Sequence, residues 1–126
     1  FKKKGYKVCG VDPAKLPANI SNDKGIYTIN DFFNKQTIDK IIEKFGNVDL
    51  ITSQNVLAHI DDLQGTFKLI YSLLKENGHF VFEIGYFRTV LETGCFDTIY
   101  HEHLDYHQGG SLIKYLSLNL LIFILL

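Results

Sequence analysis

Short apolar runs recur along the chain and alternate with longer segments in which apolar residues are spaced as on one face of a helix. The short runs are rich in β-branched and aromatic residues, and we predict four strands, at residues 6–11, 25–29, 48–52 and 79–84. Strands that alternate with helices indicate an α/β fold, because parallel strands need a crossover connection between them. The pattern therefore predicts a mostly parallel sheet with flanking helices.

The two clearest helical segments have recognisable ends. Residues 37–45 place their apolar side chains at helical spacing and stop at the glycine that follows. A second helix is predicted to be capped by Asp61 or Asp62 and to run through Leu74. The pair at residues 77–78, Asn-Gly, is expected to end that helix before the fourth strand.

An apolar segment closes the chain. Residues 115–126 are apolar apart from two polar side chains, and they are fewer than the ~18–20 residues that a membrane span requires. We predict a buried strand or helix there, with a frameshifted or prematurely ended reading frame as the alternative.

We expect residues 1–106 to be the central part of one domain and residues 107–126 to be a separate tail. The chain contains no methionine, so we also expect the N-terminal part of a larger protein to precede Phe1.

Composition and charge narrow the class of protein. Of the 126 residues, 46% are hydrophobic and 21% are charged, which is typical of a globular domain. The formal net charge of −1, with both signs mixed along the chain, favours neither nucleic acid nor a membrane surface as a partner. Cys9 and Cys95 stand far apart and outside any Cys-x-x-Cys pair, so we expect no metal site, no disulfide and a cytoplasmic location.

Acidic residues follow the first two predicted strands. Asp12 stands where folds of this type bind the ribose hydroxyls of an adenosine-containing cofactor, although an Asp before Pro is also a common helix cap. Asp31 with Phe32 could hold an adenine amino group and stack on its ring, or could be a cap beside core phenylalanines. The glycine-rich loop that usually precedes such an acid by about 20 residues would lie before Phe1.

Asn55 and His59 follow the third predicted strand, again at its carboxyl end. Ligands of open α/β sheets bind along this edge, so both side chains are candidates for contacting a cofactor or substrate. The alternative is that both tie down the backbone of the loop.

The densest cluster of reactive side chains lies at residues 96–106. Its last seven residues hold two imidazoles, two carboxylates and two phenols, which together offer a general base, a hydrogen-bond donor and an orienting carboxylate. In an extended chain His101 and His103 share one face, which leaves open a metal site, but no third ligand follows at a familiar spacing. A solvated loop without function is the other alternative.

These features together resemble the sugar C-methyltransferase family, whose members act on nucleotide-linked 4-keto-deoxysugars. The resemblance runs from about Tyr6 to Tyr106, and its most specific part is Phe-Asp-Thr-Ile-Tyr-His-Glu-His. It is carried by four segments, at residues 10–13, 55–60, 82–83 and 96–104. It implies a partial Rossmann-like methyltransferase fold with the first strand and glycine loop missing.

The resemblance also implies S-adenosylmethionine as cofactor and a nucleotide-linked keto sugar as substrate. Asp12 would bind the ribose of the cofactor, and Asp31 with Phe32 would flank its adenine. Asn55 and His59 would line the cleft shared by cofactor and substrate.

Catalysis would fall to the last segment of the resemblance. His103 would be the general base, with Glu102 as its catalytic partner and Tyr100 as a nearby polar helper. The implied reaction removes a proton from the carbon next to the ketone, and the enolate then takes the methyl group.

The chain also departs from the family. The family's N-terminal zinc-binding domain and glycine-containing loop do not occur in it, and no match continues beyond Tyr106. We therefore expect an incomplete fragment, and a truncated product without activity is one alternative. A nicotinamide-dependent oxidoreductase or epimerase is the other, although that class gives no reason for the Tyr-His-Glu-His cluster.

Overall fold

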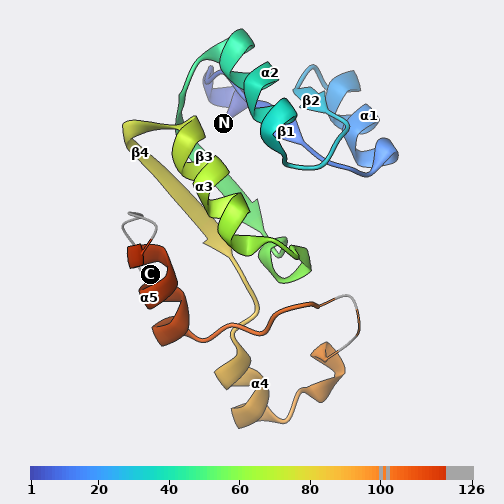
Figure 1. Ribbon diagram of the computed structural model, residues 1–126. Helices are drawn as coiled ribbons and strands as arrows, with labels where there is room; N and C mark the ends of the chain where they lie inside the picture. Colours follow the sequence, from blue (N-terminus) through green and yellow to red (C-terminus); the bar gives the residue numbers. More distant parts are fainter. Residues whose placement is uncertain (100, 102, 119–126) are drawn as a thin grey trace. The chain divides into compact units, whose positions relative to one another are not determined.

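The computed structural model describes residues 1–99, 101 and 103–118, and its ribbon is shown in Figure 1. The chain divides into two compact units, Phe1–Asn47 and Val48–Leu126. Each unit contains one pair of parallel strands together with helices. The predicted α/β fold with parallel strands is therefore confirmed.

The first unit alternates helices and strands. Its elements are η1 (Lys2–Lys4), β1 (Cys9–Val11), α1 (Lys15–Asp23), β2 (Tyr27–Ile29) and α2 (Lys35–Phe45). β1 and β2 pair in parallel along their whole length. Glycine is required in β1 because a Cβ at Gly10 would lie 2.9 Å from Oγ1 of Thr28. The core is apolar and comes from both helices and β2: Ala18, Ile29, Ile38 and Ile41.

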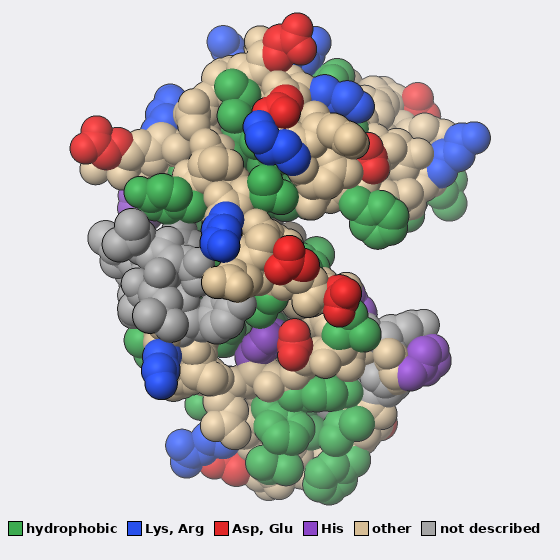
Figure 2. Space-filling view, viewed as in Figure 1, with side chains coloured by type: hydrophobic (Ala, Val, Ile, Leu, Met, Phe, Trp, Pro, Cys, Tyr) green, Lys and Arg blue, Asp and Glu red, His purple; other side chains and the backbone are tan. Residues whose placement is uncertain are grey.

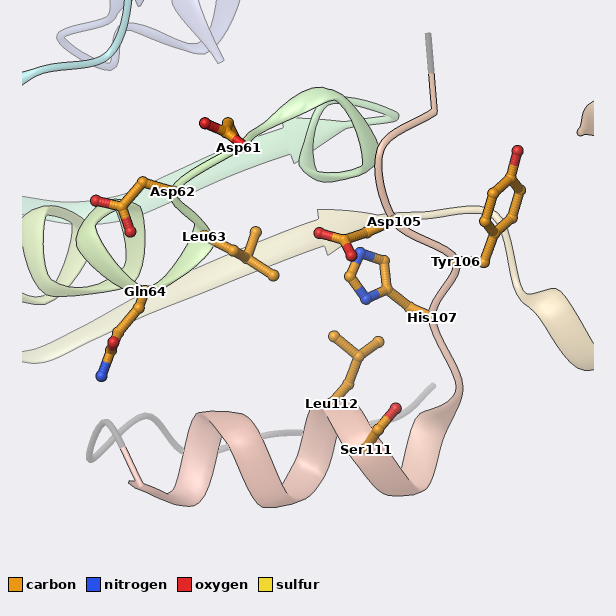
Figure 3. Close-up of a pocket in the computed structure, with 9 residues that line it drawn as sticks. All are labelled: Asp61, Asp62, Leu63, Gln64, Asp105, Tyr106, His107, Ser111 and Leu112. Atoms are coloured by element: carbon orange, nitrogen blue, oxygen red, sulfur yellow. The ribbon is translucent and has the colours of Figure 1, made fainter. Parts of the chain in front are cut away.

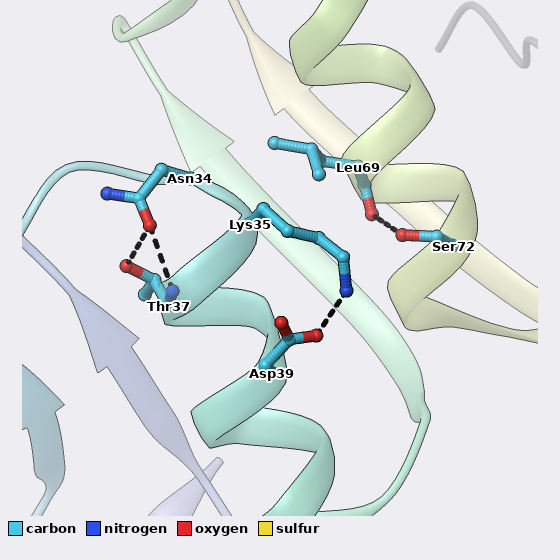
Figure 4. A network of polar contacts seen from close by, with 6 residues as sticks. All are labelled: Asn34, Lys35, Thr37, Asp39, Leu69 and Ser72. Carbon is cyan, nitrogen blue, oxygen red and sulfur yellow. Dashed lines mark hydrogen bonds and ion pairs between the residues drawn. The ribbon is translucent and has the colours of Figure 1, made fainter.

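Helix α2 begins at a side-chain cap (Figure 4). Oδ1 of Asn34 accepts hydrogen bonds from the backbone N of Thr37 at 2.9 Å and from its Oγ1 at 3.0 Å. The cap lets the helix start at Lys35, two residues before the predicted start. Buried Ile38 and Ile41 then place the apolar face of the helix on the core, as their spacing predicts.

The second unit carries the remaining elements. They are β3 (Val48–Gln54), η2 (Leu57–His59), α3 (Leu63–Leu73), β4 (Leu74–Glu83), α4 (Phe87–Thr93), η3 (Phe96–Thr98) and α5 (Gly109–Leu118). β3 and β4 pair in parallel, so that both strands end at one edge, with Gln54 opposite Glu83. The buried apolar side chains come from η2, α3 and α5: Leu57, Ala58, Phe67, Ile70, Leu73, Leu112 and Leu116.

The helix before β4 is shorter than predicted. It ends at Leu73, and β4 begins at the next residue, opposite Val48. The ladder resumes with Leu50 opposite His79, so β4 advances five residues while β3 advances two. The predicted Asn-Gly turn at residues 77–78 therefore lies in a bulge inside the strand and does not end the helix.

The apolar segment begins as a helix. α5 covers Gly109–Leu118 and buries Leu112 and Leu116, whereas the rest of the segment, residues 119–126, lies outside the described residues. None of the helices that the structure describes combines the length and the apolar character of a membrane span.

Candidate functional site

Asp12 and Asp31 stand at the carboxyl ends of the paired strands β1 and β2. Oδ1 of Asp12 accepts a hydrogen bond from the backbone N of Ala14 at 2.8 Å. Oδ1 of Asp31 accepts one from the backbone N of Phe32, also at 2.8 Å. Each carboxylate thus shapes its own loop, while its second oxygen makes no hydrogen bond to a described residue. Such an oxygen is an acceptor for a ribose hydroxyl or an adenine amino group.

The neighbouring side chains support a ligand at this edge. The ring of Phe32 is 71% exposed, so it does not belong to the core and offers a flat apolar face. Nδ2 of Asn30 donates to the backbone O of Asp12 at 3.0 Å and of Pro13 at 2.9 Å, which ties the loop after β2 to the loop after β1. The pattern of the sequence did not identify Asn30, because an Asn after a strand is typical of any turn.

The edge where β3 and β4 end holds a second polar arrangement. Asn55 follows β3 directly and has a φ of 53°, the one positive φ outside glycine among the described residues. Its backbone N donates to the backbone O of Glu83 at 2.9 Å. Its Nδ2 donates to Oε1 of the same Glu83, also at 2.9 Å. Asn55 therefore ties its loop down, as one of the two predictions for it states.

A row of ring contacts holds His103 in place. Its imidazole lies 4.9 Å from that of His59 and 5.9 Å from the ring of Tyr106, measured between ring centroids. Tyr106 in turn lies 5.4 Å from the ring of Phe87 in α4. The structure thus brings two predicted site residues, His59 and His103, into contact although they are far apart in sequence.

The backbone reinforces this contact. The backbone O of Ala58 accepts hydrogen bonds from the backbone N of Leu104 at 2.7 Å and of Asp105 at 3.4 Å. Ala58 is also buried, so its burial and these hydrogen bonds hold the turn that carries His59 against the segment that carries His103. Two other predicted catalytic residues, Tyr100 and Glu102, lie outside the described residues.

A cavity of about 540 Å³ lies between the start of α3, the segment after His103 and the start of α5 (Figure 3). It is lined by Asp61, Asp62, Leu63, Gln64, Asp105, Tyr106, His107, Ser111 and Leu112. Asp62 caps α3, as predicted, because its Oδ1 accepts from the backbone N of Gly65 at 2.8 Å. Its acidic lining would repel a phosphate group.

His107 is the buried polar residue beside this cavity. Its Nε2 has less than 1 Å² of exposed surface and no hydrogen-bond partner within the described part of the chain. Burial lowers the pKa of the His107 imidazole, and the carboxylate of Asp105 offsets that effect in part. A ligand in the cavity cannot reach Nε2 without a rearrangement, so we assign the residue no contact with a ligand.

Several apolar side chains between residues 86 and 106, the part of the chain that includes His103, are exposed. They are Tyr86, Leu91, Phe96, Ile99, Leu104 and Tyr106. Figure 2 shows hydrophobic side chains gathered in the lower part of the view, where α4 lies in Figure 1. This part of the second unit therefore offers both apolar and polar contacts to a ligand.

The described residues give little support for a metal site. Within them, no group of three or more His, Cys, Asp or Glu side chains is placed to hold a metal ion. The alternative in which His101 and His103 bind a metal therefore lacks a third ligand among those residues. Cys9 and Cys95 form no disulfide in the part of the chain that the structure describes, and burial raises the pKa of the Cys9 thiol.

The predicted residues thus fall into two groups, one in each unit. Known proteins show similarity across both. A family model described as "Methyltransferase domain" matches residues 1–118. The protein named C-methyltransferase NovU, from Streptomyces niveus, is 36% identical over 112 residues, which is 89% of this chain. The match covers 27% of that relative, so the chain spans about a quarter of its length.

Proposed function

Since the chain belongs to the methyltransferase-domain family, we propose that the protein containing it transfers a methyl group from S-adenosylmethionine to a carbon next to the ketone of a nucleotide-linked deoxysugar. The observation that carries the proposal is the placement of His103 against His59 and Tyr106. The name of the NovU relative supports methylation at carbon, and the Phe-Asp-Thr-Ile-Tyr-His-Glu-His segment supports the sugar substrate. We place the protein in the cytoplasm.

The residues after β1 and β2 fit the adenosine part of this cofactor. Asp12 has one carboxylate oxygen left to accept from the ribose hydroxyls, and Asp31 has one left for the adenine amino group. The exposed ring of Phe32 can stack on the adenine. When bound, S-adenosylmethionine supplies a methyl group that its positive sulfonium already activates. In the second unit, Asn55 and His59 are the residues that we propose to contact cofactor or substrate.

The protein must then supply a base and hold it still. A neutral His103 imidazole can take the proton from the carbon next to the ketone, which leaves the electron pair of the C–H bond in an enolate. The two flanking rings restrict the orientation of the imidazole, and this restriction lowers the entropic cost of proton transfer. By the family resemblance, Glu102 would be the catalytic partner of His103 and Tyr100 a polar helper, and both lie outside the described residues.

A labelling assay on the full-length protein tests the proposal. S-Adenosylmethionine labelled in its methyl group and a nucleotide-linked 4-keto-deoxysugar should give a product whose label is bound to a carbon beside the ketone. The variant His103→Ala should lower this rate about 10²–10⁴-fold, the usual contribution of a general base, while cofactor binding stays near normal. Label on oxygen or nitrogen, or full turnover by the variant, would contradict the proposal. His79→Ala, an exposed imidazole in β4, is the matched control.

The alternative of a nicotinamide-dependent enzyme has less support. Tyr71 and Lys75 have the Tyr-x-x-x-Lys spacing found in some oxidoreductases of that class. The ammonium of Lys75, however, bonds both carboxylate oxygens of Asp49, at 2.8 and 2.9 Å, and is thereby occupied.

A further inference from the structure

Glu83 and Asn55 form a clamp where β3 and β4 end. Two hydrogen bonds join them, one from the backbone N of Asn55 to the backbone O of Glu83 and one between their side chains, each 2.9 Å long. The left-handed backbone of Asn55 lets both groups of the same residue face Glu83 at once. Asn tolerates this conformation better than most residues, which explains its place here.

The clamp is connected to His103 by short steps. Asn55 is followed two residues later by the turn Leu57–His59, whose Leu57 and Ala58 are buried. The backbone O of Ala58 holds the backbone N of Leu104, the residue after His103, at 2.7 Å. A shift of this turn therefore moves the segment that carries the proposed base.

The clamp adds too little to the stability of the fold for stability to explain why it is present. Glu83 and Asn55 are both exposed, and a hydrogen bond between exposed side chains contributes little to folding because water competes for both groups. A residue with positive φ at the edge of a sheet where ligands bind is instead typical of a functional constraint.

We propose that Glu83 is a positioning residue, which acts through Asn55 to fix the turn Leu57–His59 and thereby His103. This inference rests on the proposed function for its catalytic consequence. The carboxylate is needed as a hydrogen-bond acceptor, and its Oε1 is the atom that matters. The amide oxygen of a glutamine can take the same place.

Kinetics of the full-length protein test the catalytic consequence. Glu83→Ala should lower kcat about 10- to 100-fold, as expected for a misplaced base, and should leave the KM for S-adenosylmethionine within about twofold. Glu83→Gln should restore most of kcat because its carbonyl oxygen still accepts from Asn55. Glu76→Ala, which removes another exposed acid of β4, is the control and should change neither parameter. An equal loss in the Ala and Gln variants would overturn the positioning role, because it would mean that the charge of Glu83 acts directly.

Hydrogen exchange separates this inference from the proposed function. In Glu83→Ala, but not in Glu83→Gln, the amides of Leu104 and Asp105 should exchange faster, because their acceptor on Ala58 is no longer held. Faster exchange in a protein that transfers no methyl group would reject the proposed function and keep the positioning role. Unchanged exchange together with unchanged kcat would overturn the positioning role itself.

Discussion

At the scale of single residues, Asp12 carries the proposed contact with the ribose of S-adenosylmethionine. Its Oδ1 is engaged with Ala14, so the proposed ribose contact depends on the second oxygen and on the negative charge. Asp12→Asn keeps an acceptor for Ala14 and removes the charge. We expect its dissociation constant for S-adenosylhomocysteine to rise about 10- to 100-fold, the usual value of a hydrogen bond to a charged group. Calorimetric titration measures it, and an unchanged constant would contradict the assignment. Asp39→Asn on α2 is the control.

The sequence predicted which strand ends carry polar residues but not how those residues bond. Asp12, Asp31 and Asn55 were identified because each follows an apolar run. Asn30 and Glu83 were given no role, since their importance comes from partners that lie 17 to 28 positions away in the chain. Long-range hydrogen bonds of this kind leave no periodic pattern, so only the structure reveals them.

At the scale of elements, apolar periodicity located the helices and strands better than it located their ends. The first strand was predicted from residue 6 but begins at Cys9, because β2 is only three residues long and offers no partner for more. The helix before β4 was predicted to run through Leu74, with the Asn-Gly pair at residues 77–78 as its end signal. In the structure these residues belong to strand β4 instead, because Leu74 already pairs with Val48 of β3.

The cap of α2 provides a test at this scale. Asn34 accepts from the backbone N of Thr37, a residue with no exposed surface, so water cannot replace the lost bond. Asn34→Ala should therefore lower the free energy of unfolding by about 1 kcal/mol, whereas Asn34→Ser should cost only a few tenths because it keeps an acceptor. Urea denaturation measures both values. Equal stability of the two variants would show that α2 does not depend on this cap.

At the scale of the whole molecule, each unit of the chain carries its own group of predicted residues. Asp12 and Asp31 belong to the first unit, while Asn55, His59 and His103 belong to the second. The parallel α/β fold could be predicted because the local spacing of apolar residues indicates each strand and helix. The contact between His59 and His103 could not, because it forms between segments 44 residues apart (103 − 59) only after the chain has folded.

The pH dependence of stability provides a second test of the folded molecule. Burial lowers the pKa of His107 from its ordinary value of 6.5, with a partial offset from Asp105. Below about pH 6.5 the unfolded chain binds a proton that the folded chain resists, so the free energy of unfolding falls as the pH falls towards the lowered pKa. Well above pH 6.5 the imidazole is neutral in both the folded and the unfolded chain, so it no longer makes the free energy of unfolding depend on pH.

Two substitutions isolate this effect. His107→Leu and His107→Gln cannot titrate, so both should lose the part of the pH dependence that His107 contributes. At pH 7 the Leu variant should also be more stable than the Gln variant, by about 1–3 kcal/mol, because it removes a buried nitrogen without a partner among the described residues while Gln retains polar atoms there. Urea denaturation from pH 5 to pH 8 measures both expectations. Each variant gives a curve of the free energy of unfolding against pH. If the curves of the wild-type protein and the Leu variant run parallel over this range, the imidazole is protonated equally easily in the folded and unfolded states.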